Sequence, residues 1–167
     1  MKFSRSKTKA TAIALFLVLT IAVTLVALPV ANAHTPPWTN IPTWAYVGVS
    51  PNPVGVGQTA TIVFWLDKVP PTAAGIGGDR WRNLKIEVTK PDGSKETLGP
   101  FVSDPVGGAY TTYTPDQVGT YSLVFSFPGQ VLSRYGPTGI VGSTTSVYEN
   151  DTYLASSATA TLTVQQE

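Results

Sequence analysis

The chain has 167 residues, and its 11 lysines and arginines nearly balance its 10 aspartates and glutamates. One histidine and no cysteine are present, which excludes disulfides, a lipid-modified cysteine and a cysteine nucleophile. Charged residues make up only 13%, whereas 15 glycines and 14 prolines indicate many turns, a composition typical of an all-β module.

Residues 1–33 have the parts of a secretory signal peptide. Four basic residues open the segment, residues 10–28 are apolar apart from three threonines, and Ala31-Asn32-Ala33 after Pro29 is a small-x-small cleavage site. The alternative is a retained anchor, because the apolar run is nearly long enough to cross a bilayer. In both cases we expect the rest of the chain to be secreted or at the cell surface, with membrane contact only through residues 10–28 if uncleaved.

Removal of residues 1–33 changes the charge of the chain. The remaining 134 residues carry seven basic and ten acidic residues, a net charge of −3. This length is enough for one domain that is stabilised by its core alone. Because no basic patch is present, we expect no nucleic-acid partner.

Residues 34–44 form a proline-rich lead that favours an extended path. From Ala45 onward, apolar residues at every second position predict short strands separated by turns. Pro51-Asn52-Pro53 interrupts the first strand, so we expect this strand to switch between two sheets. The expected strands cover residues 46–50, 54–58, 59–67, 84–90, 95–98, 101–102, 110–114, 120–127 and 158–164.

The strongest pattern lies at residues 116–127, where a turn leads into a strand. Tyr121, Leu123, Phe125 and Phe127 share one face of this strand, and small or polar residues occupy most of the other. The whole pattern predicts one antiparallel β-sandwich of seven to eight strands over residues 45–167, with a long loop at 128–157.

Catalysis and metal binding have few candidate residues. His34 would become the amino terminus after cleavage and could chelate copper, but the chain offers no second imidazole. A single histidine argues against a Ser-His-Asp arrangement, and the loop acids show no converging pattern. Glu149-Asn150-Asp151 lacks the spacing of an EF-hand loop. We therefore expect no enzyme activity, no cofactor and no metal, although Asn150 begins an Asn-Asp-Thr sequon that a glycan could occupy.

Aromatic side chains are the remaining candidates for a binding surface. Trp65 falls on the outward phase of its strand, and Trp81 stands between two arginines in a loop. Tyr135, Tyr148 and Tyr153 lie in the long loop. If these rings are exposed they form a recognition surface, and the alternative is that the tryptophans cover the sheet or fill the end of the sandwich.

Asp116-x-x-Gly119-x-Tyr121 resembles the tyrosine corner of immunoglobulin-like and fibronectin-like sandwiches. The resemblance implies that the Tyr121 hydroxyl bonds to the backbone a few residues upstream. The stretches VSPNPVGVGQTATIVFWL, KPDGS, TPDQVGTYSLVFSFPGQ and YENDTYLASSATATLTVQ also resemble the Ig-like domains at the start of secreted archaeal surface proteins. Some of those proteins continue into β-propeller repeats of the quinoprotein type. The cysteine pair and strand-C tryptophan of antibody domains are absent.

We therefore expect a non-catalytic extracellular module for adhesion, which contacts a protein or an envelope component through loop 128–157. One alternative is a carbohydrate-binding module that holds an envelope polysaccharide with exposed tryptophan and tyrosine rings. The other is a subunit of a surface fibre that donates residues 35–50 into a neighbour's sheet.

Overall fold

The structure, a computed structural model, describes residues 9, 11–18, 38–73, 77–132 and 148–166. The chain divides into two compact units, residues 1–33 and residues 34–167. In the first unit, residues 9 and 11–18 are helical. Within the described ranges, no helix combines the length and apolar character that crossing a membrane requires. The expected cleavage site and much of the expected anchor lie outside these ranges.

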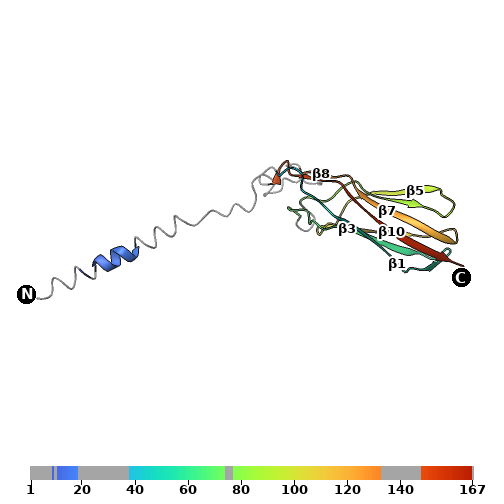
Figure 1. The fold of residues 1–167 in the computed structure, drawn as a ribbon, viewed down its shortest axis with the longest axis horizontal. Helices are drawn as coiled ribbons and strands as arrows, with labels where there is room; N and C mark the ends of the chain where they lie inside the picture. The colour runs from blue at the N-terminus through green and yellow to red at the C-terminus, as the bar shows by residue number, and fades with distance from the viewer. Residues whose placement is uncertain (1–8, 10, 19–37, 74–76, 133–147, 167) are drawn as a thin grey trace, which may run out of the picture. The chain divides into compact units, whose positions relative to one another are not determined.

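The second unit is an antiparallel β-sandwich (Figure 1). One sheet has three strands in the order β1-β3-β6, and the other has five strands in the order β2-β10-β7-β4-β5. The first sheet consists of β1 (Ala45–Ser50), β3 (Ala60–Leu66) and β6 (Gly108–Tyr113). The second consists of β2 (Val54–Gly55), β4 (Leu84–Thr89), β5 (Lys95–Phe101), β7 (Gly119–Phe127) and β10 (Ser156–Gln165). This architecture confirms the predicted immunoglobulin-like sandwich.

The first strand switches sheets at the prolines, as the sequence predicted. β1 pairs antiparallel with β3, whereas β2 pairs parallel with β10. Asn52 fastens the crossover, because its side-chain amide donates to Thr161 O at 2.8 Å and its carbonyl accepts from Thr163 N at 2.9 Å. Pro51 and Pro53 have no main-chain N–H to donate to the neighbouring strand, so the Asn52 side chain makes the bonds to β10 at this point.

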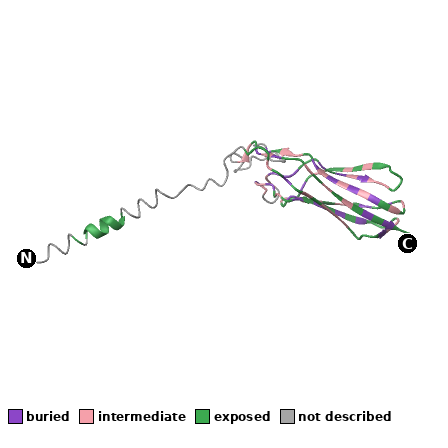
Figure 2. Ribbon diagram, viewed as in Figure 1, coloured by how far each residue is buried: buried purple, intermediate pink, exposed green. Residues whose placement is uncertain are grey.

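The core lies between the two sheets and follows the period-2 pattern (Figure 2). Every second residue of β3 is buried, and Tyr121, Leu123, Phe125 and Phe127 are the buried residues of β7. Across the sandwich, the rings of Phe64 and Phe125 pack 5.0 Å apart at 44°. All buried apolar residues of the described chain lie between Val54 and Val164, so the second unit has a core of its own.

Two local features differ from the prediction. β5 is one continuous strand, where the sequence suggested separate strands at residues 95–98 and 101–102. Gly99 permits this path at φ 113°, because an added Cβ would lie 2.8 Å from Leu84 O, where the pairing of β4 and β5 shifts register. Loop 128–157 is also partly paired, since β8 (Gln130–Val131) pairs with β9 (Thr152–Tyr153). Residues 133–147 of this loop lie outside the described ranges.

Candidate functional site

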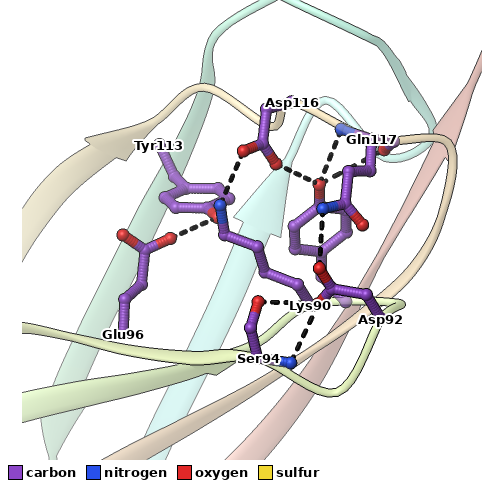
Figure 3. A network of polar contacts seen from close by, with 8 residues as sticks. Lys90, Asp92, Ser94, Glu96, Tyr113, Asp116 and Gln117 are labelled. Carbon is purple, nitrogen blue, oxygen red and sulfur yellow. Dashed lines mark hydrogen bonds and ion pairs between the residues drawn. The ribbon is translucent and has the colours of Figure 1, made fainter.

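The Tyr121 hydroxyl bonds to residues of the turn at 115–119, and Figure 3 shows Asp116 and Gln117 of this turn within a polar network. It accepts a hydrogen bond from Gln117 N at 2.9 Å and lies 3.0 Å from Asp116 Oδ1 and 3.2 Å from Gln117 O. Burial raises the pKa of Tyr121 above its ordinary value, so the hydroxyl stays protonated and can donate. These bonds close the turn onto the strand that follows it.

Two carboxylates join this turn to the hairpin turn between β4 and β5. Lys90 Nζ lies 2.6 Å from Asp116 Oδ2, and this contact lowers the pKa of Asp116 and raises the pKa of Lys90. Asp92 accepts bonds from Ser94 and from the Gln117 amide, and these bonds lower its pKa to about 2. The network links the turn between β4 and β5 to the turn before β7, so we assign it a structural role.

Gly119 is required by the same arrangement. Its φ is 136°, and an added Cβ would lie 2.8 Å from both Cβ and Cγ of Pro91. A side chain there meets a backbone penalty and a steric clash together. Asp116, Gly119 and Tyr121 therefore stabilise the turn that precedes β7.

Trp81 is buried, which excludes it from a recognition surface and agrees with the alternative that its ring fills the end of the sandwich. Its indole Nε1 donates to Lys68 O at 2.7 Å, and its ring packs 5.6 Å from Phe127 and 4.7 Å from Tyr153. Tyr153 is buried beside it, and burial raises the pKa of Tyr153 to about 12. Both rings pack in the sandwich interior, where the Trp81 indole N–H is satisfied by Lys68 O.

The remaining candidate residues of loop 128–157 differ in exposure. Tyr148 is half-buried, Asn150 is exposed at φ 70°, and Tyr135 lies outside the described ranges. Asp151 is buried and accepts a bond from Trp38 N at 2.7 Å, so it anchors the proline-rich lead. Across the described ranges, no three histidine, cysteine or acidic side chains gather in a way that could hold a metal. His34 lies outside these ranges.

Trp65 is exposed and belongs to a larger apolar surface. Its ring stacks on Tyr46 with centroids 5.4 Å apart and planes 12° apart. These residues are register partners on β3 and β1, and Val63 pairs with Tyr110 of β6 on the same outer face. We define the aromatic face as Trp44, Tyr46, Val63, Trp65 and Tyr110. Each is at least 42% exposed, and Tyr110 is 73% exposed.

Charge is nearly absent from the aromatic face. Asp67 follows β3 opposite Trp44, where it accepts from Trp44 N at 2.7 Å and pairs with Lys68 Nζ at 2.7 Å. The two charges balance each other, so the surface is apolar and locally neutral. The rings of Tyr46 and Trp65 are stacked with an offset. They cannot lie edge to edge in one plane, because two coplanar rings would overlap at a centroid distance of 5.4 Å.

A groove opens where the proline-rich lead meets the aromatic face. It has a volume of about 590 Å³, within the usual range for ligand sites. Lys68 Nζ lies 5.3 Å from the ring centroid of Trp44, which places a cation on an indole face. The groove is lined by Trp38, Thr39, Asn40, Ile41, Pro42, Trp44 and Lys68.

Sequence reasoning found Trp65 but missed most of its neighbours. Tyr46, Val63 and Tyr110 each fall on the outward phase of their own strand, and this signal is visible in the sequence. Their assembly into one surface depends on the order β1-β3-β6 and on its register, which the strand pattern alone does not determine.

The strand order, the divided first strand and the closed turn before β7 define an immunoglobulin-like β-sandwich. No family model and no curated protein matches the chain. Among solved structures, it is similar to the PKD domain of an M14-like peptidase from Thermoplasmatales archaeon SCGC AB-540-F20. The two are 17% identical with a TM-score of 0.35, and the match covers 74% of this chain and 98% of that one.

Proposed function

We propose that this chain is an extracytoplasmic, non-catalytic module that binds a protein or an envelope component through its aromatic face. The observation that carries this proposal is the contrast between the two outer surfaces. Four large side chains on the three-stranded sheet are exposed, and so is Trp44 directly before β1. The outer face of the five-stranded sheet is mainly hydroxyl-bearing or charged, with Lys85, Glu87, Ser122, Ser126, Thr159, Thr161 and Thr163.

The chemistry of the aromatic face supports binding. Tyrosine and tryptophan bury large areas with few rotatable bonds, and they dominate the binding energy of many interfaces. The strands hold these rings in place before a partner arrives, which reduces the entropy lost on association. Exposure of a contiguous apolar surface is unfavourable in water, so a partner that covers it gains hydrophobic free energy.

Residues 1–33 support a location outside the cytoplasm, because their pattern is that of an export signal. The folded unit needs no disulfide for its core, and the chain has no cysteine to form one. We place the binding surface on the sheet, because its rings are exposed there, whereas Tyr153 of loop 128–157 is buried.

The test uses the folded unit, residues 34–167, and purified cell envelopes of the source organism. Tyr46→Ser combined with Trp65→Ser removes the stacked rings of the aromatic face. We expect the bound fraction in a co-sedimentation assay to fall about tenfold or more, a loss typical of interface anchors. The control, Thr161→Ala combined with Thr163→Ala, alters the opposite face and should retain binding. Equal binding by both double variants, or no binding by the wild type, would remove the proposal.

Carbohydrate binding is the second candidate, and the groove between Trp38 and Trp44 favours it. Indole faces stack against the C–H faces of sugar rings, and the partly exposed Lys68 ammonium can donate to a hydroxyl. Titration with soluble envelope polysaccharide would be followed by tryptophan fluorescence. Trp44→Ala should abolish the response, and Trp65→Ala, outside the groove lining, should retain it. If both variants keep the fluorescence response, the groove is not the sugar site.

Fibre formation by strand donation has less support. Ala45–Ser50 forms part of the segment expected to be donated, and it pairs with β3 of its own chain. Donation of that segment would require this pairing to open. We therefore rank it behind the other two functions.

A further inference from the structure

The outer strands of the two sheets differ in how they are protected from pairing with other chains. β2 has only two residues and follows Pro53, and β5 carries Lys95, Pro100 and a register shift. β1 packs beside β10 of the other sheet. Short length, lysine, proline and bulges are the usual devices that block edge-to-edge association.

β6 has none of these devices. Its six residues, Gly108–Tyr113, contain no charge and no proline, and in the described chain it pairs with β3 alone. Tyrosine and threonine are strand-favouring residues, and they make up four of the six positions. β6 is therefore the edge of the sandwich that is best suited to pair with another strand.

The direction of each main-chain group on β6 follows from its pairing. Leu66 N donates to Gly107 O at 3.3 Å, and the N–H and C=O groups of successive strand residues point to opposite sides. Ala109, Thr111 and Tyr113 therefore bond to β3, and Tyr110 and Thr112 point their main-chain groups to the open edge. Gly108 points the same way, but it is already bonded to Asp104 through Asp104 N and Oδ1.

We propose that β6 pairs antiparallel with β6 of a second copy of this chain, across a two-fold axis at Thr111. In this register, Tyr110 of each copy lies opposite Thr112 of the other copy. The N–H and C=O groups of Tyr110 and Thr112 that point to the open edge therefore all find partners in both copies. The two three-stranded sheets join into one six-stranded sheet. The site is the main-chain edge, so the proposal goes beyond partner binding by the side chains of the aromatic face.

A second copy fits this edge because β6 has no side chain that would be repelled by the same side chain of the other copy across a two-fold axis. A charge near the axis would meet a like charge, and β6 carries none. Asp104 lies in the turn that precedes β6, where its carboxylate accepts bonds from Val106 N and Gly108 N. Tyr110 and Thr112 are both exposed, so the approach to the edge is open on the outer side. Aromatic and β-branched side chains opposite each other favour the pairing.

Sedimentation velocity of residues 34–167 over a range of concentrations tests the proposal. The wild type should show a concentration-dependent monomer–dimer equilibrium. Thr112→Pro removes an N–H that points to the open edge while it keeps every bond to β3, and edge strands tolerate proline at such positions. We expect Thr112→Pro to raise the dimer dissociation constant about tenfold or more. Thr112→Lys places like charges beside the axis and should act in the same direction.

Thr97→Lys on β5 is the matched control, because it places the same charge on an exposed residue of the other sheet. It should leave the dissociation constant unchanged, and circular dichroism should show all three variants folded. A wild type that remains monomeric at the highest concentration overturns the proposal. A dimer that persists in both Thr112 variants also overturns it. Envelope binding is measured separately, so its failure would leave this result unaffected.

Discussion

The two outer faces of the sandwich are built on the same alternation but differ in chemistry. On β7 and β10, exposed positions are mostly serine or threonine, which bond to water and favour strands. On β1, β3 and β6, outward positions include the stacked pair Tyr46 and Trp65. Burial in the core determines which residues point inward, but it places no demand on the outward ones. The aromatic face therefore needs an explanation outside folding, and partner binding provides one.

The largest expected effect comes from a change in the core that both faces share. Phe125→Ala removes a fully buried ring that packs on Phe64, and we expect a loss of about 3–5 kcal/mol in the free energy of unfolding. Val63→Ala on the aromatic face is the control, and its effect should remain within about 0.5 kcal/mol. Urea unfolding measures both. Similar losses for the two variants would mean that the aromatic face is part of the core.

The second prediction compares a buried tyrosine with an exposed one. Tyr121→Phe leaves Gln117 N without its acceptor, and we expect a loss of about 1–2 kcal/mol. Tyr110→Phe removes a hydroxyl from a residue that is 73% exposed, so the change should be within about 0.5 kcal/mol. Denaturant unfolding of the pair distinguishes a structural ring from a surface ring. No loss in Tyr121→Phe would show that its hydroxyl contributes nothing to the turn.

Acid should weaken the polar network on the side of the molecule shown in Figure 3. The pKa of Asp92 is about 2 against an ordinary 3.8, and that of Asp116 is also lowered. Because the folded-state pKa values are lower, these groups stabilise the fold above about pH 4 and lose this effect as the pH falls toward 2. Thermal unfolding midpoints between pH 5 and pH 2 measure the loss.

Asp92→Asn combined with Asp116→Asn should lower the midpoint at pH 5 and flatten its fall in acid. Both carboxylates are exposed, so we expect a modest slope. A double variant with the same slope as the wild type would show that other carboxylates govern the acid response.

Local patterns predicted the fold well, because the alternation of inward and outward residues along β7 and β10 can be recognised from consecutive residues of the sequence. Features that depend on distant partners were not predicted. The sequence left open whether Trp81 is exposed or fills the end of the sandwich, because its contacts with Lys68 O and Tyr153 join residues that are distant in the sequence. Gly99 gave no sign that its backbone passes close to Leu84 and continues β5.

The candidate site was predicted only in part for the same reason. Trp65 was identified from the phase of its own strand. Tyr46 becomes its partner only when β1 and β3 pair in the observed register, and Tyr110 joins only through β6. A one-residue slip would turn each of these side chains to the opposite face.

Trp65→Ser should have only a small effect on stability, although it should weaken binding. Trp65→Ser loses one exposed stacked contact, and we expect about 0.5–1.5 kcal/mol of destabilisation in urea unfolding. Thr161→Ala on the opposite face should be neutral within about 0.5 kcal/mol. A loss of several kcal/mol in Trp65→Ser would mean that the ring stabilises the fold and is not held ready for a partner.

The chain has no native cysteine, so a single introduced cysteine can report on one face at a time. Val63→Cys and Thr161→Cys, each carrying an environment-sensitive fluorophore, place the same probe on the aromatic face and on the opposite face. Emission spectra would be recorded while purified cell envelopes are added to residues 34–167. The account predicts a blue shift for the probe at position 63 and none at position 161. A shift at position 161 alone, or equal shifts at both positions, would contradict the assignment of binding to the aromatic face.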